Sequence, residues 1–287
     1  MKAEQNREHS MTKSIYDERC PECKGTGWET VPYPDDREQQ QRLQAIYGEL
    51  GNHHPYTIPC RRCNGGHVTK VEIAKNAAKI PNSFYDKKIS DFDWNIYRDQ
   101  EGKEINTSKQ KSMVENFIDD FAEWERDDDT KGVGFYIYSS MKGSGKTLLA
   151  SAICNSLISK YPMQTRFVSA SQLLNLAKQS DGSGNYERDP LSLLCNCKLL
   201  VLDDLGQKNS GSDWMNDVLF QIVDARYQQK LITIYTSNVP LQSLDFDDRI
   251  VDRIYKTSIK LSLPEYCVRA REANEQQRRI FKKYGLM

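Results

Sequence analysis

The sequence predicts an α/β protein, in which helices cover both faces of a parallel β-sheet, preceded by a small metal-binding domain. Three observations support this fold class. Apolar strands alternate with helical patterns from Phe135 onward, a glycine-rich turn joins the first of these strands to a helix, and two C-x-x-C pairs lie near the N-terminus. Such alternation is typical of parallel sheets, because parallel strands need a crossover connection, usually a helix.

The boundary between the domains is expected near Ile80-Pro81. Proline disfavours helical backbone in the residue before it, and the polar, cysteine-bearing stretch ends before this point. We therefore predict an N-terminal domain of residues 1–78 and a larger domain of residues 79–287. Residues 68–79, at the end of the first domain, are expected to form a strand and a helical connector.

The composition narrows the class of protein. Hydrophobic residues make up 38% of the 287 residues, which is enough for a packed core. The 40 Lys and Arg balance the 40 Asp and Glu, which excludes an overall cationic coat for nucleic acid but not a local basic groove. The chain has no run of about 18 apolar residues and no apolar signal segment at its start. We therefore expect no membrane contact and a cytoplasmic location, where cysteines are thiols or metal ligands.

Hydrophobic spacing predicts the elements of the larger domain. Apolar runs such as FYIYS and KLLVL indicate buried strands, whereas apolar residues three and four apart indicate helices. Strands are expected at 135–139, 165–170, 198–202, 231–236 and 258–263, and helices at 147–161, 169–179, 214–229, 247–255 and 265–283. The charged stretch EWERDDDT at 123–130 is expected to be a solvated linker or a helix end.

Two close cysteine pairs predict a structural zinc site. Cys20 and Cys23 form one C-x-x-C pair, Cys60 and Cys63 form the other, and 36 residues separate the pairs. Two such pairs provide the four thiolates of a closed tetrahedral Zn²⁺ site. Four ordinary thiols and a redox pair are the alternatives. His53, His54 and His67 are alternative ligands, although surface roles are favoured for them.

A phosphate-binding loop is expected after the first strand of the larger domain. The segment SMKGSGKT at 140–147 matches the pattern G-x-x-x-x-G-K-[ST], except that Ser140 stands at the first glycine. Its backbone N–H groups precede a helix, where they can bind phosphate. Lys146 is expected to contact the β- and γ-phosphates and Thr147 to hold Mg²⁺. The predicted binding residues here are Gly143, Ser144, Gly145, Lys146, Thr147 and Leu148.

Two carboxylates and an amide are expected beside this loop. The buried strand KLLVL delivers Asp203 and Asp204 to the carboxyl edge of the sheet, where doubly wound folds bind ligands. Asp203 is expected to hold Mg²⁺, and Asp204 to orient or deprotonate an attacking water. Asn238 follows the next strand and is expected to hold that water or sense the γ-phosphate; a turn cap is the alternative.

An arginine-bearing helix follows. Arg249 and Arg253 are four residues apart and share one helix face. Arg253 is the better candidate for an arginine finger that reaches the γ-phosphate of a neighbouring subunit. A surface helix with intrahelical pairs is the alternative.

Together these motifs resemble the AAA+ ATPases of the DnaC/DnaI helicase-loader and IstB transposition-helper group. The resemblance covers residues 79–283 and rests on SMKGSGKT, KLLVLDDLG, the TSN at 236–238 and the helix DDRIVDRI. It implies ATP and Mg²⁺ as ligands. The implied roles are Walker A for Lys146 and Thr147, Walker B for Asp203 and Asp204, sensor 1 for Asn238 and arginine finger for Arg253. A sensor 2 arginine is expected at Arg269, with Arg271 as the alternative.

The resemblance implies an ATPase that loads a hexameric replicative helicase onto single-stranded DNA and self-assembles through its ATP site. The four-cysteine module resembles the zinc-bearing region of DnaI-type loaders that contacts the helicase, and IstB-type helpers usually lack it. The segment 268–283, with six Lys and Arg against two Glu, is a basic surface for phosphate or an acidic partner, or a solvated helix face. The alternatives are an IstB-type transposition helper acting on duplex DNA and a zinc-dependent adaptor with slow turnover.

Overall fold

The computed structural model describes residues 28–31, 56–59, 70–179, 189–206 and 213–284. Residue contacts divide the chain into two units, residues 1–73 and 74–287. This division falls inside helix α2 (Lys70–Ala78), a few residues before the predicted boundary. In the region where a strand and a connector were expected, the described residues from Lys70 on are helical.

In the first unit, the structure describes a pair of short strands and the start of α2. β1 (Trp28–Val31) and β2 (Tyr56–Pro59) are antiparallel, with Trp28 opposite Pro59. The chain therefore enters β1 at the same end of the pair at which it leaves β2. The four predicted zinc ligands, Cys20, Cys23, Cys60 and Cys63, lie outside the described residues.

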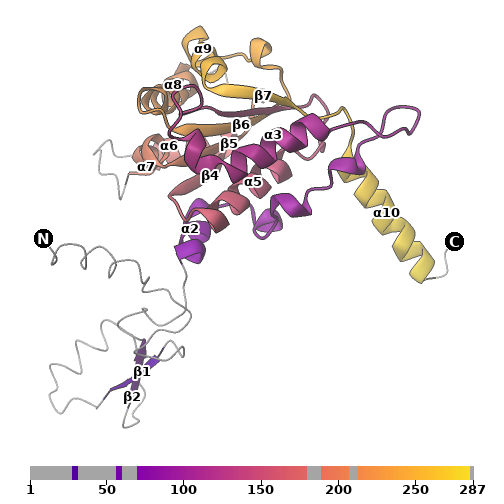
Figure 1. Cartoon of the computed structure of the whole chain (residues 1–287), viewed down its shortest axis with the longest axis horizontal. Coiled ribbons are helices and arrows are strands. Elements are labelled where there is room, and N and C mark those ends of the chain that lie inside the picture. The colour runs from indigo at the N-terminus through magenta and orange to yellow at the C-terminus, as the bar shows by residue number, and fades with distance from the viewer. Residues whose placement is uncertain (1–27, 32–55, 60–69, 180–188, 207–212, 285–287) are drawn as a thin grey trace, which may run out of the picture. The chain divides into compact units, whose positions relative to one another are not determined.

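The second unit is built on a five-stranded parallel sheet (Figure 1). Its strands are β3 (Gly134–Tyr138), β4 (Thr165–Ser169), β5 (Leu199–Leu205), β6 (Ile232–Ser237) and β7 (Ser258–Ser262). The strand order is β4-β5-β6-β3-β7, and every neighbouring pair is parallel. β3 lies between β6 and β7, so the loop that follows it starts beside the carboxyl ends of both neighbours. The predicted α/β class with a parallel sheet is confirmed.

The helices of this unit agree with the hydrophobic spacing in part. Expected helices are α5 (Lys146–Lys160), α6 (Ala170–Gln179), α8 (Asp213–Gln228), α9 (Asp248–Lys256) and α10 (Val268–Lys283). The sequence analysis missed α3 (Ser108–Asp119), α4 (Phe121–Trp124) and α7 (Pro190–Asn196). α10 begins at Val268 rather than at the predicted Glu265. Within the described ranges, no helix is long and apolar enough to cross a membrane.

Helices cover both faces of the sheet. Successive strand residues point to opposite faces, so neighbouring residues of one strand pack against different helices. On one face, Phe135 of β3 packs against Phe117 of α3, with ring centroids 4.8 Å apart. On the other face, Tyr136 joins an apolar cluster that includes Leu219 and Ile222 of α8. This three-layer arrangement holds the carboxyl edge of the sheet in place as a platform for a site.

Arg226 of α8 is a cation enclosed in this core, with 1% of its surface exposed. Its Nε donates to Thr233 Oγ1 at 2.8 Å, and its Nη atoms donate to the carbonyls of Leu194, Cys197 and Ile232 at 2.9, 2.7 and 2.6 Å. The guanidinium thus ties α8 to the α7 region and to β6.

Candidate nucleotide-binding site

The loop between β3 and α5 has the backbone of a phosphate-binding loop. Gly143 and Gly145 adopt positive φ angles of 78° and 99°, which side chains disfavour. A Cβ on Gly143 would also lie 3.0 Å from Cβ of Arg269. The buried Tyr97 donates its hydroxyl to the carbonyl of Ser144 at 3.0 Å and supports the turn. The conformation of the loop therefore requires glycine at positions 143 and 145.

Lys146, the first residue of α5, turns its ammonium back into this loop. Its Nζ donates to the carbonyls of Ser139 and Met141 at 2.9 and 3.0 Å and to Ser144 Oγ at 3.2 Å. Burial lowers the pKa of Lys146, whereas neighbouring carboxylates raise it. Neutral oxygens are weaker acceptors for an ammonium than phosphate oxygens. The ammonium can therefore exchange these partners for a phosphate.

Thr147 and Asp203 form an oxygen-rich pair next to the loop. Thr147 Oγ1 donates to Asp203 Oδ1 at 3.0 Å, and Thr236 Oγ1 donates to the same oxygen at 2.6 Å. Burial raises the pKa of Asp203, while the hydrogen bonds from Thr236 and Thr147 lower it. A hydroxyl and a carboxylate are the hard oxygen ligands that Mg²⁺ prefers. The two predicted magnesium residues therefore lie together and fit the ion.

Asp204 is held in an unusual backbone conformation beside Asn238. Asp204 has a φ of 61°, and its N–H donates to Thr236 Oγ1 at 2.9 Å. Asn238 Nδ2 donates to Asp204 Oδ1 at 3.3 Å. The buried Oδ1 of Asn238 finds no donor among the described residues. An unpaired buried acceptor is costly, so it suits contact with a water or a ligand.

A cavity of about 320 Å³ opens at the loop. Its lining residues are Phe84, Lys142, Gly143, Ser144, Gly145, Lys146, Thr147, Leu148, Asp204, Thr236, Asn238, Val268, Arg269 and Glu272. The structure thus brings Arg269 of α10 to the cavity. Arg271 instead donates to Glu275 and to the carbonyl of Ile96. Of the two sensor 2 candidates, Arg269 is the one that lines the cavity.

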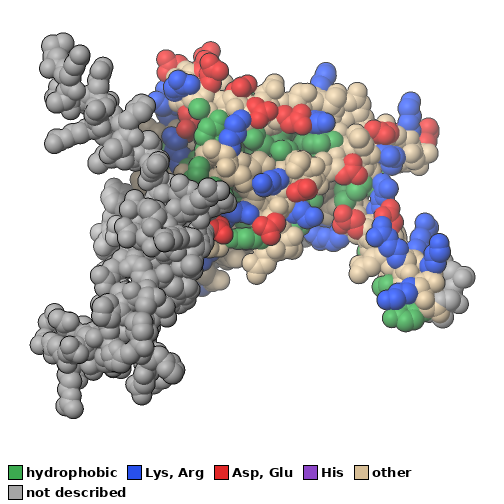
Figure 2. Space-filling view, turned by 60° about the horizontal axis from the view of Figure 1, so that its bottom comes forward, with side chains coloured by type: hydrophobic (Ala, Val, Ile, Leu, Met, Phe, Trp, Pro, Cys, Tyr) green, Lys and Arg blue, Asp and Glu red, His purple; other side chains and the backbone are tan. Residues whose placement is uncertain are grey.

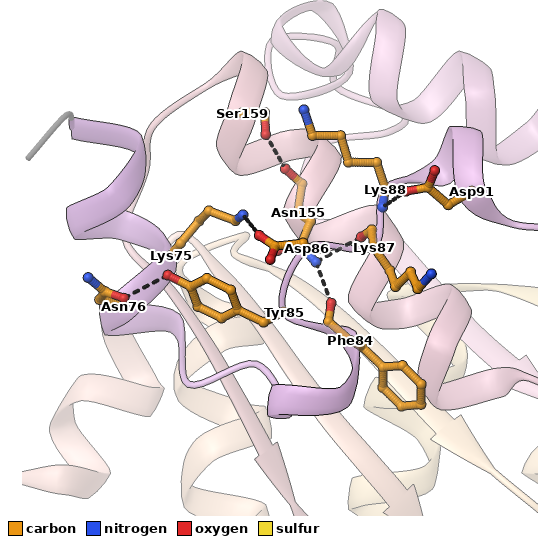
Figure 3. Close-up of polar contacts among 10 residues, drawn as sticks. All are labelled: Lys75, Asn76, Phe84, Tyr85, Asp86, Lys87, Lys88, Asp91, Asn155 and Ser159. Carbon is orange, nitrogen blue, oxygen red and sulfur yellow. Dashed lines mark hydrogen bonds and ion pairs between the residues drawn. The ribbon is translucent and has the colours of Figure 1, made fainter. Parts of the chain in front are cut away.

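The segment before the sheet brings Phe84 to this cavity, and α5 holds that segment (Figure 3). Asn155 of α5 donates its Nδ2 to the carbonyls of Phe84 and Lys87 at 2.9 and 2.8 Å. The backbone N–H of Ile89 donates to Ser156 Oγ at 2.9 Å. The same helix that begins at Lys146 therefore positions the aromatic ring at the other side of the cavity.

Arg253 does not line the cavity of its own chain. Its Nε donates to Asp224 Oδ1 of α8 at 2.6 Å, and its guanidinium lies 4.9 Å from the centre of the Phe220 ring. Arg249 lies over the same ring at 4.5 Å and pairs with Asp247. The predicted finger is thus held at the surface between α8 and α9.

Most of α10 extends away from the sheet (Figure 1). Figure 2 shows this helix at the right, with Lys and Arg side chains along it and hydrophobic side chains near its end. Ile280, Phe281 and Tyr284 are 45%, 40% and 67% exposed. The basic C-terminal surface predicted from the sequence is therefore present on a solvent-facing helix.

Comparisons with known proteins point to one group. Residues 135–275 match the family model described as IstB-like ATP binding protein. The replicative helicase loader DnaC of Escherichia coli strain K12 is 28% identical over 157 residues, which are 54% of this chain and 58% of DnaC. The replicative helicase loader DnaI of Bacillus subtilis strain 168 is 30% identical over 108 residues, which are 38% of this chain and 34% of DnaI.

A crystal structure of DnaI is 26% identical and superposes with a TM-score of 0.51, covering 65% of this chain and 96% of that one. A crystal structure of the DnaC helicase loader, 21% identical with a TM-score of 0.50, supports the fold. The second unit has an AAA+ fold. Parts of the chain are similar in sequence to the DnaC and DnaI helicase loaders.

The predicted AAA+ fold is therefore confirmed. The match to the IstB-like ATP binding protein model supports ATP and Mg²⁺ as ligands, and the cavity beside Thr147 and Asp203 fits them. The sequence comparison covers only about half of the curated loaders, or less. What the chain shares with them is thus a part of each loader rather than the whole protein.

Some residues of the site were missed from the sequence. Tyr97, Asn155 and Glu265 each make hydrogen bonds to the loop or to the segment that borders the cavity. No local pattern marks them, because their partners are distant in the chain. Thr236 lies in the TSN motif, on the strand next to the one that carries Asp203. This position was the sequence signal that could have identified it as a residue of the site.

Proposed function

We propose that this chain is an ATP-dependent loader of a replicative helicase. The observation that carries the proposal is the sequence similarity of the chain to two loaders. The second unit contains a cavity around which Lys146, Thr147 and Asp204 converge. The helicase partner and the ATPase activity are inferred from this shared domain.

The proposed hydrolysis uses side chains that already meet at the cavity. Bound Mg²⁺ supplies charge neutralisation on the phosphates. Lys146 exchanges its loop carbonyls for phosphate oxygens, and Thr147 and Asp203 offer oxygens to the ion. Asp204 accepts a proton from the attacking water or orients it. Asn238, whose Oδ1 lacks a protein donor among the described residues, holds that water in place.

We assign to two arginines the stabilisation of the negative charge that develops on the phosphates during hydrolysis. Arg269 lines the cavity of its own chain, which supports the sensor 2 role. Arg253 does not line that cavity, so we infer that it acts on the nucleotide of a second copy after leaving Asp224. Turnover then requires self-assembly and rises more steeply than linearly with protein concentration.

We also propose that the N-terminal unit carries a structural Zn²⁺ bound by Cys20, Cys23, Cys60 and Cys63. The β1–β2 register supports this: Trp28, five residues after Cys23, lies opposite Pro59, which directly precedes Cys60. Both cysteine pairs therefore join the strand pair at one end, as a shared ion requires. In this proposal the unit binds the hexameric helicase.

We propose single-stranded DNA as the nucleic-acid ligand. Exposed cations on α10 can neutralise phosphates, and the exposed rings of Phe281 and Tyr284 can stack on bases. An unpaired strand offers both groups at once, whereas the bases of a duplex are already stacked on one another. An IstB-type helper would prefer duplex DNA.

Native mass spectrometry of the full chain mixed with the replicative helicase of its host tests the main proposal. We expect an ATP-dependent complex of defined stoichiometry for the wild type and none for Lys146→Ala. ATP-dependent self-assembly on duplex DNA without a helicase complex would contradict the loader and favour the transposition helper. Zinc content is read from the same spectra.

Two variants separate the remaining parts. Arg253→Ala is expected to leave ATP binding intact and to remove assembly-dependent hydrolysis; unchanged turnover would place the finger elsewhere. Cys20→Ser is expected to release zinc and unfold only the N-terminal unit, as circular dichroism and metal analysis report. A folded N-terminal unit without metal would contradict the four-thiolate site.

A further inference from the structure

The carboxylate of Glu265 is bound to the first turn of the phosphate-binding loop. Its Oε1 accepts the backbone N–H of Ser140 at 2.9 Å, and its Oε2 accepts the backbone N–H of Met141 at 2.7 Å. Oε2 also accepts the hydroxyl of Ser140. Glu265 lies 125 residues further along the chain, between β7 and α10.

The segment around Glu265, residues 263–269, also forms backbone hydrogen bonds to the end of β3 and to the loop. The N–H of Leu263 donates to the carbonyl of Tyr138 at 2.8 Å, and the N–H of Arg269 donates to the carbonyl of Gly143 at 3.2 Å. We call residues 263–269 the C-terminal strap. Its backbone is bound at one end to the last residue of β3 and at the other end to the loop, so fixed backbone on both sides of Glu265 brings this side chain to the loop.

The backbone of Met141 is hydrogen-bonded at both its N–H and its carbonyl. Its N–H donates to Glu265, while its carbonyl accepts from the ammonium of Lys146. Ser140 stands where the loop pattern has glycine, and its hydroxyl is a donor to Glu265 that glycine lacks. The serine that replaces the glycine of the loop pattern is thus hydrogen-bonded to Glu265, a residue that lies outside the loop motif.

The direction of the pKa shift of Glu265 agrees with hydrogen bonds that stabilise its ionised carboxylate. Partial burial alone would raise the pKa of Glu265, but the hydrogen bonds from Ser140 and Met141 outweigh it, and the pKa is lowered. The side chain itself is exposed, so it contributes little to core packing. Its removal should therefore change the loop without unfolding the domain.

We infer that Glu265 is a positioning residue for the nucleotide site, which acts with the Ser140 hydroxyl to hold the phosphate-binding loop in the conformation that receives phosphate. The inference rests on the proposed nucleotide binding. We call the hydrogen bonds of Glu265 to Ser140 and Met141 the clamp. The clamp orders residues 140–141 before ATP binds, so the entropy cost of ordering them does not reduce the binding free energy of ATP. Because α10 starts three residues after Glu265, the clamp also links the position of that helix to nucleotide affinity.

The test is a double-mutant cycle on the full chain with Ser140→Ala, Glu265→Ala and the double variant. Affinity for a fluorescent ATP analogue is measured by anisotropy. We expect Glu265→Ala to weaken binding about tenfold, the effect of losing a charge-assisted hydrogen bond. Ser140→Ala should weaken it about threefold in the wild-type background and have almost no effect in Glu265→Ala.

Glu275→Ala is the matched control. It removes a carboxylate of α10 that pairs with Arg271 and does not contact the loop. It should leave nucleotide affinity at the wild-type value. An equal effect of Ser140→Ala in both backgrounds, or wild-type affinity for Glu265→Ala, would overturn the clamp.

Hydrogen exchange measured without nucleotide provides a second readout, independent of ATP binding. The amides of Ser140 and Met141 should exchange about tenfold faster in Glu265→Ala, while amides in the middle of α5 keep their protection. Unchanged exchange at these two amides would contradict the clamp even if nucleotide affinity fell. If wild type bound no ATP but exchange still changed, the clamp would stand and the proposed function would fail.

Discussion

Lys146 and Arg226 are both cations withdrawn from water in the same domain, and neither forms an ion pair among the described contacts. Arg226 sits on the α8 side of the sheet, 1% exposed, and its guanidinium donates to one hydroxyl and three carbonyls. Lys146 sits at the carboxyl edge of the sheet, 8% exposed, and lines the cavity. Both bind neutral oxygens, but only Lys146 has space beside it.

The difference shows how one kind of interaction serves structure in one place and ligand binding in another. A guanidinium presents several donors in a fixed plane, so it suits a site where all acceptors are fixed. An ammonium on a flexible stem can turn from one set of acceptors to another. Access to a cavity, rather than burial or charge, separates the binding cation from the structural one.

The largest effect should come from Arg226→Met. The substitution leaves the carbonyls of Leu194, Cys197 and Ile232 without their donor. We expect a loss of about 4 kcal/mol in the free energy of unfolding, measured with urea. Arg226→Lys, which keeps the charge but not the fork, should lose a large part of this. A loss below about 1 kcal/mol would contradict a structural role for the fork.

Lys146→Ala should show the opposite pattern. The substitution frees the carbonyls of Ser139 and Met141. Because the Lys146 side chain lines the cavity, water can enter the space that the ammonium leaves. We expect the free energy of unfolding to change by less than about 1 kcal/mol, while ATP affinity falls about 100-fold. Calorimetric binding and urea unfolding measure both. Lys160→Ala, at the exposed end of the same helix, is the control that should keep wild-type affinity.

Asn155→Ala tests an uncharged counterpart of Arg226. Removal of the amide takes the side-chain donor from the carbonyl of Lys87 and leaves the carbonyl of Phe84 with only the backbone N–H of Lys87, so the segment that borders the cavity is held less firmly. We expect a loss of about 2 kcal/mol in unfolding free energy and a few-fold weaker binding of adenine nucleotides. Ser159→Ala, which removes only a bond to the Asn155 carbonyl, is the control. Equal effects of the two variants would argue against a positioning role for the amide.

The smallest expected effect concerns Asp203. Burial raises its pKa above the ordinary value of 3.8, so the native state holds this proton more tightly than the unfolded chain. As pH rises from that value through the folded pKa, the unfolded state loses its proton first and stability is lost. Without added Mg²⁺, Asp203→Asn should therefore be up to about 1 kcal/mol more stable than wild type at neutral pH.

Thermal unfolding at several pH values measures this difference. The gap between Asp203→Asn and wild type should close as the pH falls below 3.8, where Asp203 becomes protonated in the unfolded state as well as in the native state. A gap that stayed constant with pH would show that ionisation of Asp203 is not its cause.

The sequence by itself determined the features that depend on short-range pattern. The strand–loop–helix order placed Lys146 and Thr147, and apolar runs located the strand that carries Asp203 and the strand that Asn238 follows. Parallel strands share one carboxyl edge, so these residues had to meet. The helical spacing of the buried residues Val114, Phe117 and Ile118 is a local signal for α3, which was not predicted.

Only the tertiary structure decided which distant residues support the site. The contacts of Glu265 with Ser140 span 125 residues, those of Asn155 with Phe84 span 71, and neither pair has a motif. It also selected Arg269 over Arg271 for the cavity and placed Arg253 against Asp224. Local propensity and periodicity act over a few residues, whereas these contacts depend on how the strands are ordered in the sheet and where α10 leaves it.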